Sequence, residues 1–142
     1  MKKIHLILML PVFLTGCAGL PSLDERPESH YLDIRSAPRM DALLNTATAK
    51  TSGDISNVYL LNDAHEAFVA RAALIEAADH TLDLQYYIWH NDLSGKLMFN
   101  LIHRAAERGV RVRLLLDDNN TNGLDNVLLA LDSHPNIEIR LF

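Results

Sequence analysis

The chain has 142 residues, about the length of one domain with a short additional segment. Apolar residues make up 49% of it and charged residues 22%, which is typical of a globular protein and excludes a disordered one. The formal net charge of −5 argues against non-specific binding to nucleic acid, and a single cysteine, Cys17, excludes an intramolecular disulfide.

The first 16 residues predict a secretory signal. Lys2 and Lys3 precede the apolar stretch Ile4–Leu14, which is too short to span a bilayer core. The stretch ends in Leu-Thr-Gly-Cys17, which resembles the lipobox of bacterial lipoproteins, where the cysteine thiol receives a diacylglycerol before cleavage. The resemblance implies that Cys17 is a lipidation site. The alternatives are an ordinary signal peptide with an incidental cysteine, or a buried N-terminal helix.

Lipidation at Cys17 would tie the protein to a membrane of the bacterial cell envelope. Two or three acyl chains anchor a protein firmly, whereas one chain binds marginally. Ala18 follows the cysteine where an aspartate would, by the same resemblance, favour the inner membrane. Outer-membrane sorting is therefore the expectation.

Residues 17–57 are predicted to form a tether. Pro21, Pro27 and Pro38 are expected to break helices, and residues 51–54 have the composition of a loop. Met40–Ala49 could form a short helix. Without the leader, the chain carries 11 basic and 18 acidic residues, so the exported part is more acidic, at −7.

From residue 58 onward the sequence predicts strands and helices in alternation. The expected strands are Val58–Leu61, Thr81–Trp89, Val110–Leu116 and Ile137–Phe142. The expected helices run from a cap at Asn62 or Asp63 to about Ala78, from a Ser94 cap to Arg108, and from Leu124 to Ser133.

This βαβαβαβ order predicts an α/β layered sandwich with a mainly parallel sheet, because strands joined through helices run parallel. Alternation places Leu82, Leu84, Tyr86 and Ile88 on one side of their strand, with Trp89 on the other. Leu97, Leu101, Ile102 and Ala105 should face inward from the second helix. No helix follows the last strand, so residues 58–142 are expected to be an incomplete domain, and residues 17–142 alone are expected to be inactive and prone to aggregate.

Ligands in such sheets bind beyond the carboxyl ends of the strands, which places Tyr86, Tyr87 and Asp117 near a possible site. Asp117 and Asp118 could hold Mg²⁺. The favoured interpretation is a turn at Asp118–Asn122, with Asn122 capping the next helix. We therefore expect no metal and no cofactor.

Other side chains that could carry chemistry are better explained as surface groups. His80, His90 and His134 fall at the ends of elements, and His103 lies inside a predicted helix without a paired histidine four residues away. Four arginines lie around the second helix and third strand, namely Arg104, Arg108, Arg111 and Arg113. They could face phosphates or anionic lipid, but a solvated face is the favoured interpretation.

The segment Leu82–Asp118 resembles the opening of the phospholipase D superfamily, in particular bacterial cardiolipin synthases. There, a strand ending in Tyr-Tyr-Ile leads to Asp and Gly before a helix, then to Ala-Ala-x-x-Gly-Val and a strand ending in Leu-Asp-Asp. The matching residues are Tyr86, Tyr87, Ile88, Asp92, Gly95, Ala105, Ala106, Gly109, Val110, Asp117 and Asp118. With the continuation through Asn136–Phe142, the resemblance covers about 85 of the 142 residues.

Activity in that family depends on an H-x-K-x-x-x-x-D motif, usually present twice, whose histidines form a phosphohistidine and transfer protons without a metal. None of the seven histidines in this chain has lysine two positions later. The chain therefore offers no catalytic residue of the family type. The motif would follow soon after the strand that ends here.

Three hypotheses about function follow. In the first, the chain is the N-terminal fragment of a lipid-anchored phosphatidyltransferase that makes cardiolipin from phospholipid substrates, and the fragment itself is inactive. In the second, it is a complete small lipoprotein with a binding or structural role. In the third, it comes from a phospholipase D-type phosphodiesterase or nuclease, although the acidic charge makes nucleic acid the weaker partner.

Overall fold

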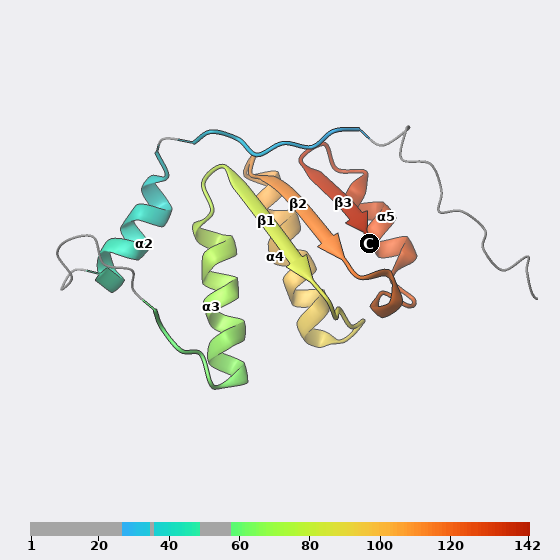
Figure 1. Ribbon diagram of the computed structural model, residues 1–142, viewed down its shortest axis with the longest axis horizontal. Helices are drawn as coiled ribbons and strands as arrows, with labels where there is room; N and C mark the ends of the chain where they lie inside the picture. Colours follow the sequence, from blue (N-terminus) through green and yellow to red (C-terminus); the bar gives the residue numbers. More distant parts are fainter. Residues whose placement is uncertain (1–26, 35, 49–57) are drawn as a thin grey trace, which may run out of the picture. The chain divides into compact units, whose positions relative to one another are not determined.

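The computed structural model describes residues 27–34, 36–48 and 58–142 (Figure 1). The predicted leader, Cys17 and about half of the predicted tether lie outside these residues. Contacts divide the chain into two units, with the boundary in the sequence between Tyr31 and Leu32. The second unit contains every helix and strand described below. Among the described residues, no helix is both long and apolar enough to cross a membrane.

The second unit is an α/β structure, as the sequence predicts. Three parallel strands, β1 (Thr81–Tyr86), β2 (Arg111–Leu116) and β3 (Ile137–Leu141), lie in the order β1-β2-β3. The helices α3 (Ala64–Ala77), α4 (Leu93–Glu107) and α5 (Asp125–Asp132) alternate with them, and a 3₁₀ turn, η2 (Asp118–Asn120), follows β2. Each helix and strand from residue 64 onward lies within a few residues of its predicted bounds.

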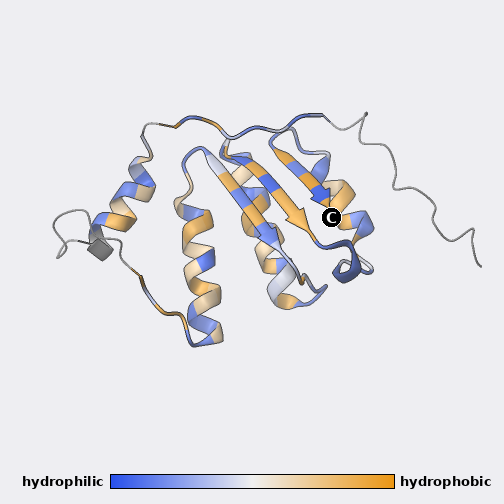
Figure 2. Cartoon of the chain, viewed as in Figure 1, coloured by the Kyte–Doolittle hydropathy of each residue, from blue (hydrophilic) through white to orange (hydrophobic). Residues whose placement is uncertain are grey.

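The strand register explains where the core forms. Leu82, Leu84 and Tyr86 of β1 lie opposite Val112, Leu114 and Leu116 of β2, and the β2 side chains lie in turn opposite Ile137, Ile139 and Leu141 of β3. These positions share one face of the sheet, and α4 and α5 lie behind that face (Figure 1). Apolar and polar residues alternate along β1 and β3 (Figure 2). The core therefore lies between this face and the helices.

The opposite face of the sheet carries charged side chains, so helices cover one face and not both in the described part of the chain. Asp83 of β1 lies directly opposite Arg113 of β2, and the guanidinium donates two hydrogen bonds of 2.6 Å to the carboxylate. The hydrogen bonds from Arg113 lower the pKa of Asp83, which keeps the carboxylate ionised. Cross-strand pairs of opposite charge stabilise a sheet.

The predicted strand Val58–Leu61 does not form. These four residues have no regular structure and are exposed, Val58 at 92%. Tyr59 and Leu61 line a hollow with α3 instead of pairing with the free edge of β1. A four-residue apolar run does not distinguish a strand from a loop that packs on a helix.

A short helix before the domain is confirmed. Helix α2 runs from Pro38 to Thr48, and Pro38 opens its first turn rather than breaking it, because proline has no N–H to lose there. Asp79 accepts hydrogen bonds from the backbone N–H groups of Arg39 and Met40 at 2.9 and 3.1 Å. The carboxylate satisfies two of the N–H groups that every helix start leaves free.

The start and inward face of α4 also differ from prediction. Asp92 is the N-cap, and Ser94 donates its hydroxyl to the Asp92 carboxylate instead of capping the helix itself. Leu97 is 47% exposed, whereas Met98, Phe99, Ile102, Ala105 and Ala106 are buried. Gly109 ends the helix as predicted, with a φ of +89° that suits glycine.

The last strand is better covered than the sequence predicts. Helix α5, which precedes β3, packs against it, so Ile137 is buried and Ile139 half-buried. Only the end of the strand remains open, with Leu141 and Phe142 exposed. Leu124, rather than Asn122, is the residue before α5, and it makes no side-chain cap.

Candidate functional site

The carboxyl ends of the three strands meet at one edge of the sheet, as the parallel order requires. Tyr86 lies opposite Leu116, and Leu116 lies opposite Leu141. Just beyond them, the Asp117 N–H donates to the Tyr86 carbonyl at 3.1 Å, and the Asp118 N–H donates to the Phe142 carbonyl at 3.2 Å. The backbone after β2 therefore connects both neighbouring strands at the edge where ligands bind in such folds.

Asp117 is placed at this edge but serves the turn. It is 8% exposed, and its carboxylate accepts hydrogen bonds from the Asn119 N–H at 2.9 Å and the Asn120 side-chain amide at 3.1 Å. These bonds make Asp117 the N-cap of η2. The structure thus supports the turn interpretation, with the cap one residue earlier than the predicted turn.

Tyr86 lies in an aromatic cluster that the sequence did not reveal. Trp89 meets Tyr86 edge to face, with ring centroids 4.8 Å apart, and stacks on Phe99 at 4.5 Å. Trp89 is buried, contrary to the strand alternation, because β1 ends at Tyr86 and the following residues turn. Tyr87 and Ile88 are exposed, so of the three predicted residues only Tyr86 and Asp117 are partly or fully enclosed at the edge.

A pocket of about 130 Å³ opens beside this cluster, over the first turn of α4. Its walls combine apolar rings with ionisable groups, among them Arg71, Tyr86, Trp89, His90 and Asp92. The Trp89 indole Nε1–H is buried there without a hydrogen-bond partner. The pocket therefore combines aromatic walls with side chains of both charges, at the edge where the sequence places the site.

Asp92 fixes one wall of the pocket. Its carboxylate accepts from the Gly95 N–H and the Ser94 hydroxyl, both at 2.8 Å, and these bonds hold its pKa below the ordinary value. Gly95 is the third residue of the helix, and a Cβ there would lie 2.1 Å from the His90 carbonyl oxygen. The Asp-x-x-Gly spacing thus joins the capping aspartate to the one helix residue that must lack a side chain.

The arginine run is held by carboxylates rather than directed at an anion. Glu76 of α3 pairs with Arg104 at 3.3 Å and with Arg108 at 3.5 Å, and Asp83 pairs with Arg113. Arg108 also donates to the Ile75 carbonyl at 3.0 Å. These contacts join α3 to α4 and β1 to β2, so the structure supports the interpretation of a solvated, paired face.

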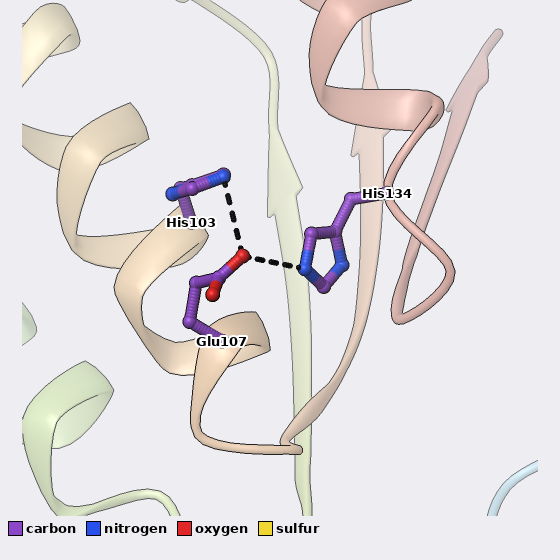
Figure 3. A group of neighbouring side chains, drawn as sticks. All are labelled: His103, Glu107 and His134. Carbon is purple, nitrogen blue, oxygen red and sulfur yellow. Dashed lines mark hydrogen bonds and ion pairs between the residues drawn. The ribbon is translucent and has the colours of Figure 1, made fainter.

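Away from this edge, the structure brings together His103, Glu107 and His134 (Figure 3). The sequence predicts the two histidines as separate surface groups. His134 is less exposed than predicted, with 16% of its side chain accessible. Within the described residues, this group has the side-chain composition and convergence of a metal site. The available signal was a histidine and a glutamate four residues apart on one helix, but nothing in the sequence joined His134 to them.

Comparison with known proteins identifies the relationship of the chain. No protein-family profile matches it. It is 61% identical over 85 residues to cardiolipin synthase C of Escherichia coli, a match that covers 60% of this chain and 18% of that protein. The chain is a sequence relative of the cardiolipin synthases. Cardiolipin synthase A of Pseudomonas entomophila shows 33% identity over 96 residues, which is 68% of this chain and 19% of the relative.

The chain thus spans about a fifth of the length of these cardiolipin synthases. The relationship confirms the predicted resemblance to the phospholipase D-type enzymes of phospholipid metabolism. Among solved structures, the archaeal chromatin protein TrmBL2, whose structure is described as showing a novel mode of DNA binding, superposes with a TM-score of 0.51. That match covers 72% of this chain and 40% of TrmBL2 at 16% identity, which is a likeness of fold.

Proposed function

We propose that the chain is the amino-terminal part of a lipid-anchored phosphatidyltransferase that makes cardiolipin by moving a phosphatidyl group between phospholipid headgroups. The observation that carries the proposal is the 61% identity to cardiolipin synthase C over 85 residues. That identity is high enough to imply the same arrangement of strand ends and of the pocket beside Tyr86 and Trp89. Phospholipid is then the substrate class.

In this proposal the chain supplies one wall of the site and none of the reacting groups. It contains no histidine followed two residues later by lysine, and it spans about a fifth of its relatives. The nucleophilic histidine and the lysines that stabilise phosphoryl charge would then come from residues that follow Phe142 in the longer protein. The 142 residues alone are expected to be inactive.

Activity tests the proposal directly. The purified 142-residue chain is incubated with vesicles of phosphatidylglycerol, and lipid products are separated by mass spectrometry. We expect no cardiolipin from this chain, and cardiolipin from a protein that continues the reading frame past Phe142. Cardiolipin formation by the 142 residues alone, or none by the longer protein, would contradict it.

The same preparations separate the other two hypotheses. A longer protein that cleaves single- or double-stranded DNA, and leaves phosphatidylglycerol unchanged, would favour the phosphodiesterase hypothesis. A stop codon directly after Phe142 would favour a small lipoprotein with a binding role. The acidic charge of the exported part weighs against the nucleic-acid hypothesis.

We also propose that Cys17 carries the membrane anchor and that the protein resides in the outer membrane. The lipobox resemblance and Ala18 support this. In bacteria fed radiolabelled palmitate, the parent chain should become labelled and sediment with membranes, whereas Cys17→Ser should do neither and Thr15→Ser should behave as the parent. Ala18→Asp is expected to move the labelled protein to the inner-membrane fraction. Equal labelling of Cys17→Ser would exclude the anchor.

A further inference from the structure

The His103, Glu107 and His134 side chains converge on the side of α4 that faces the turn between α5 and β3 (Figure 3). The Glu107 Oε1 atom lies 3.1 Å from His134 Nε2 and 3.8 Å from His103 Nε2. One ligand atom from each residue lies within 4.8 Å of the other two. The histidine rings meet edge to face, with centroids 5.5 Å apart.

The elements that carry these side chains are fixed to one another. His103 and Glu107 lie one turn apart on α4, so their side chains share a face of the helix. Asn136 connects the turn to that helix, because its side-chain amide donates to the Ala106 carbonyl at 3.1 Å. The Asn136 backbone N–H donates to His134 Nδ1, also at 3.1 Å, and orients the imidazole with Nε2 toward Glu107.

Two imidazoles and one carboxylate are the ligand types that Zn²⁺ and its first-row neighbours prefer. Tetrahedral Zn²⁺ with bonds of about 2.0–2.1 Å separates its ligand atoms by about 3.3 Å. The distances of 3.1 and 3.8 Å from Glu107 bracket that value. His103 is 48% exposed, so its ring can rotate to close the remaining gap without disturbing the core.

We propose that His103, Glu107 and His134 bind a divalent transition-metal ion such as Zn²⁺, with solvent in the remaining position. This site lies apart from the pocket beside Trp89, and its role is to join α4 to the α5–β3 turn. Without metal, the His134 ring donates from Nε2 to Glu107 and accepts from Asn136 at Nδ1. Coordination through Nε2 moves the ring proton to Nδ1, so the Asn136 N–H can no longer donate a hydrogen bond to that nitrogen.

Calorimetric titration of the 142-residue chain with ZnCl₂ near neutral pH tests the proposal. We expect one Zn²⁺ site with a dissociation constant on the order of micromolar, and at least about tenfold weaker binding in His103→Ala and in His134→Ala. His65→Ala is the matched control, because His65 also lies near a carboxylate but outside the cluster. Its affinity should equal that of the parent.

The variant His103→Ala keeps the test decisive, since that side chain is exposed and its removal leaves the turn intact. Circular dichroism should show an unchanged helix content. In the parent chain, Zn²⁺ should shift the Asn136 amide resonance, and in His103→Ala the shift should require at least about tenfold more metal. Equal Zn²⁺ affinity of the parent and the double variant His103→Ala/His134→Ala, or an unmoved Asn136 resonance, would overturn the proposal.

Discussion

Replacing Ile102 with alanine is expected to lower the free energy of unfolding by about 2–5 kcal/mol. Ile102 is fully buried in the middle of α4, within the core formed with β2. The substitution removes three buried carbon atoms and leaves a cavity that the surrounding strands and helices cannot fill without moving. Urea unfolding followed by circular dichroism measures the loss.

Leu97 on the same helix is the matched control, because the sequence analysis and the structure disagree about it. Leu97 is 47% exposed, so Leu97→Ala should change the free energy of unfolding by no more than about 0.5 kcal/mol. A large loss at Leu97 would show that the inward face of α4 includes Leu97, as the sequence predicts. A small loss at Ile102 would contradict the described packing, in which Ile102 is fully buried.

Replacing Gly95 with alanine is expected to destabilise the protein by about 1–3 kcal/mol, although alanine is the better helix former by about 1 kcal/mol. The new Cβ would lie 2.1 Å from the His90 carbonyl oxygen and 3.0 Å from Trp89 Nε1. The first contact is with backbone, so a side-chain rotation cannot relieve it. The start of α4 must move away from the loop after β1, which would also reshape the pocket.

Lys96→Ala provides the comparison, since Lys96 is the next residue of α4 and is exposed. The two substitutions add alanine to the same turn, and only the one at position 95 meets the His90 carbonyl. Thermal unfolding should show a lower midpoint for Gly95→Ala and an almost unchanged one for Lys96→Ala. Equal or higher stability of Gly95→Ala would mean that the loop after β1 does not approach the helix this closely.

The sequence predicts the fold well where periodicity extends over many residues. The strand β2 alternates in burial along its whole length, and Asp63 caps α3 through hydrogen bonds to the backbone N–H groups of His65 and Glu66. Short patterns were less informative. The four apolar residues Val58–Leu61 lack a partner strand, and strand alternation failed at Trp89 because the chain turns after Tyr86.

The features of the candidate site also differ in how far the sequence predicts them. Placing Tyr86 and Asp117 at one edge requires only the order of parallel strands. The stacking of Trp89 on Phe99 depends on how a loop packs against a helix, and the approach of His134 to Glu107 joins residues 27 positions apart in the chain. Such contacts follow from tertiary packing, which no local pattern contains.

The order β1-β2-β3 has a consequence for the way in which the chain assembles. Strand neighbours in the sheet are also neighbours along the chain, with paired residues 30 positions apart for β1 and β2 and 25 for β2 and β3. Each strand can therefore dock on the edge already formed as soon as it has been synthesised, without waiting for distant residues. Such stepwise growth from one end of the chain keeps unpaired strand edges short-lived during folding.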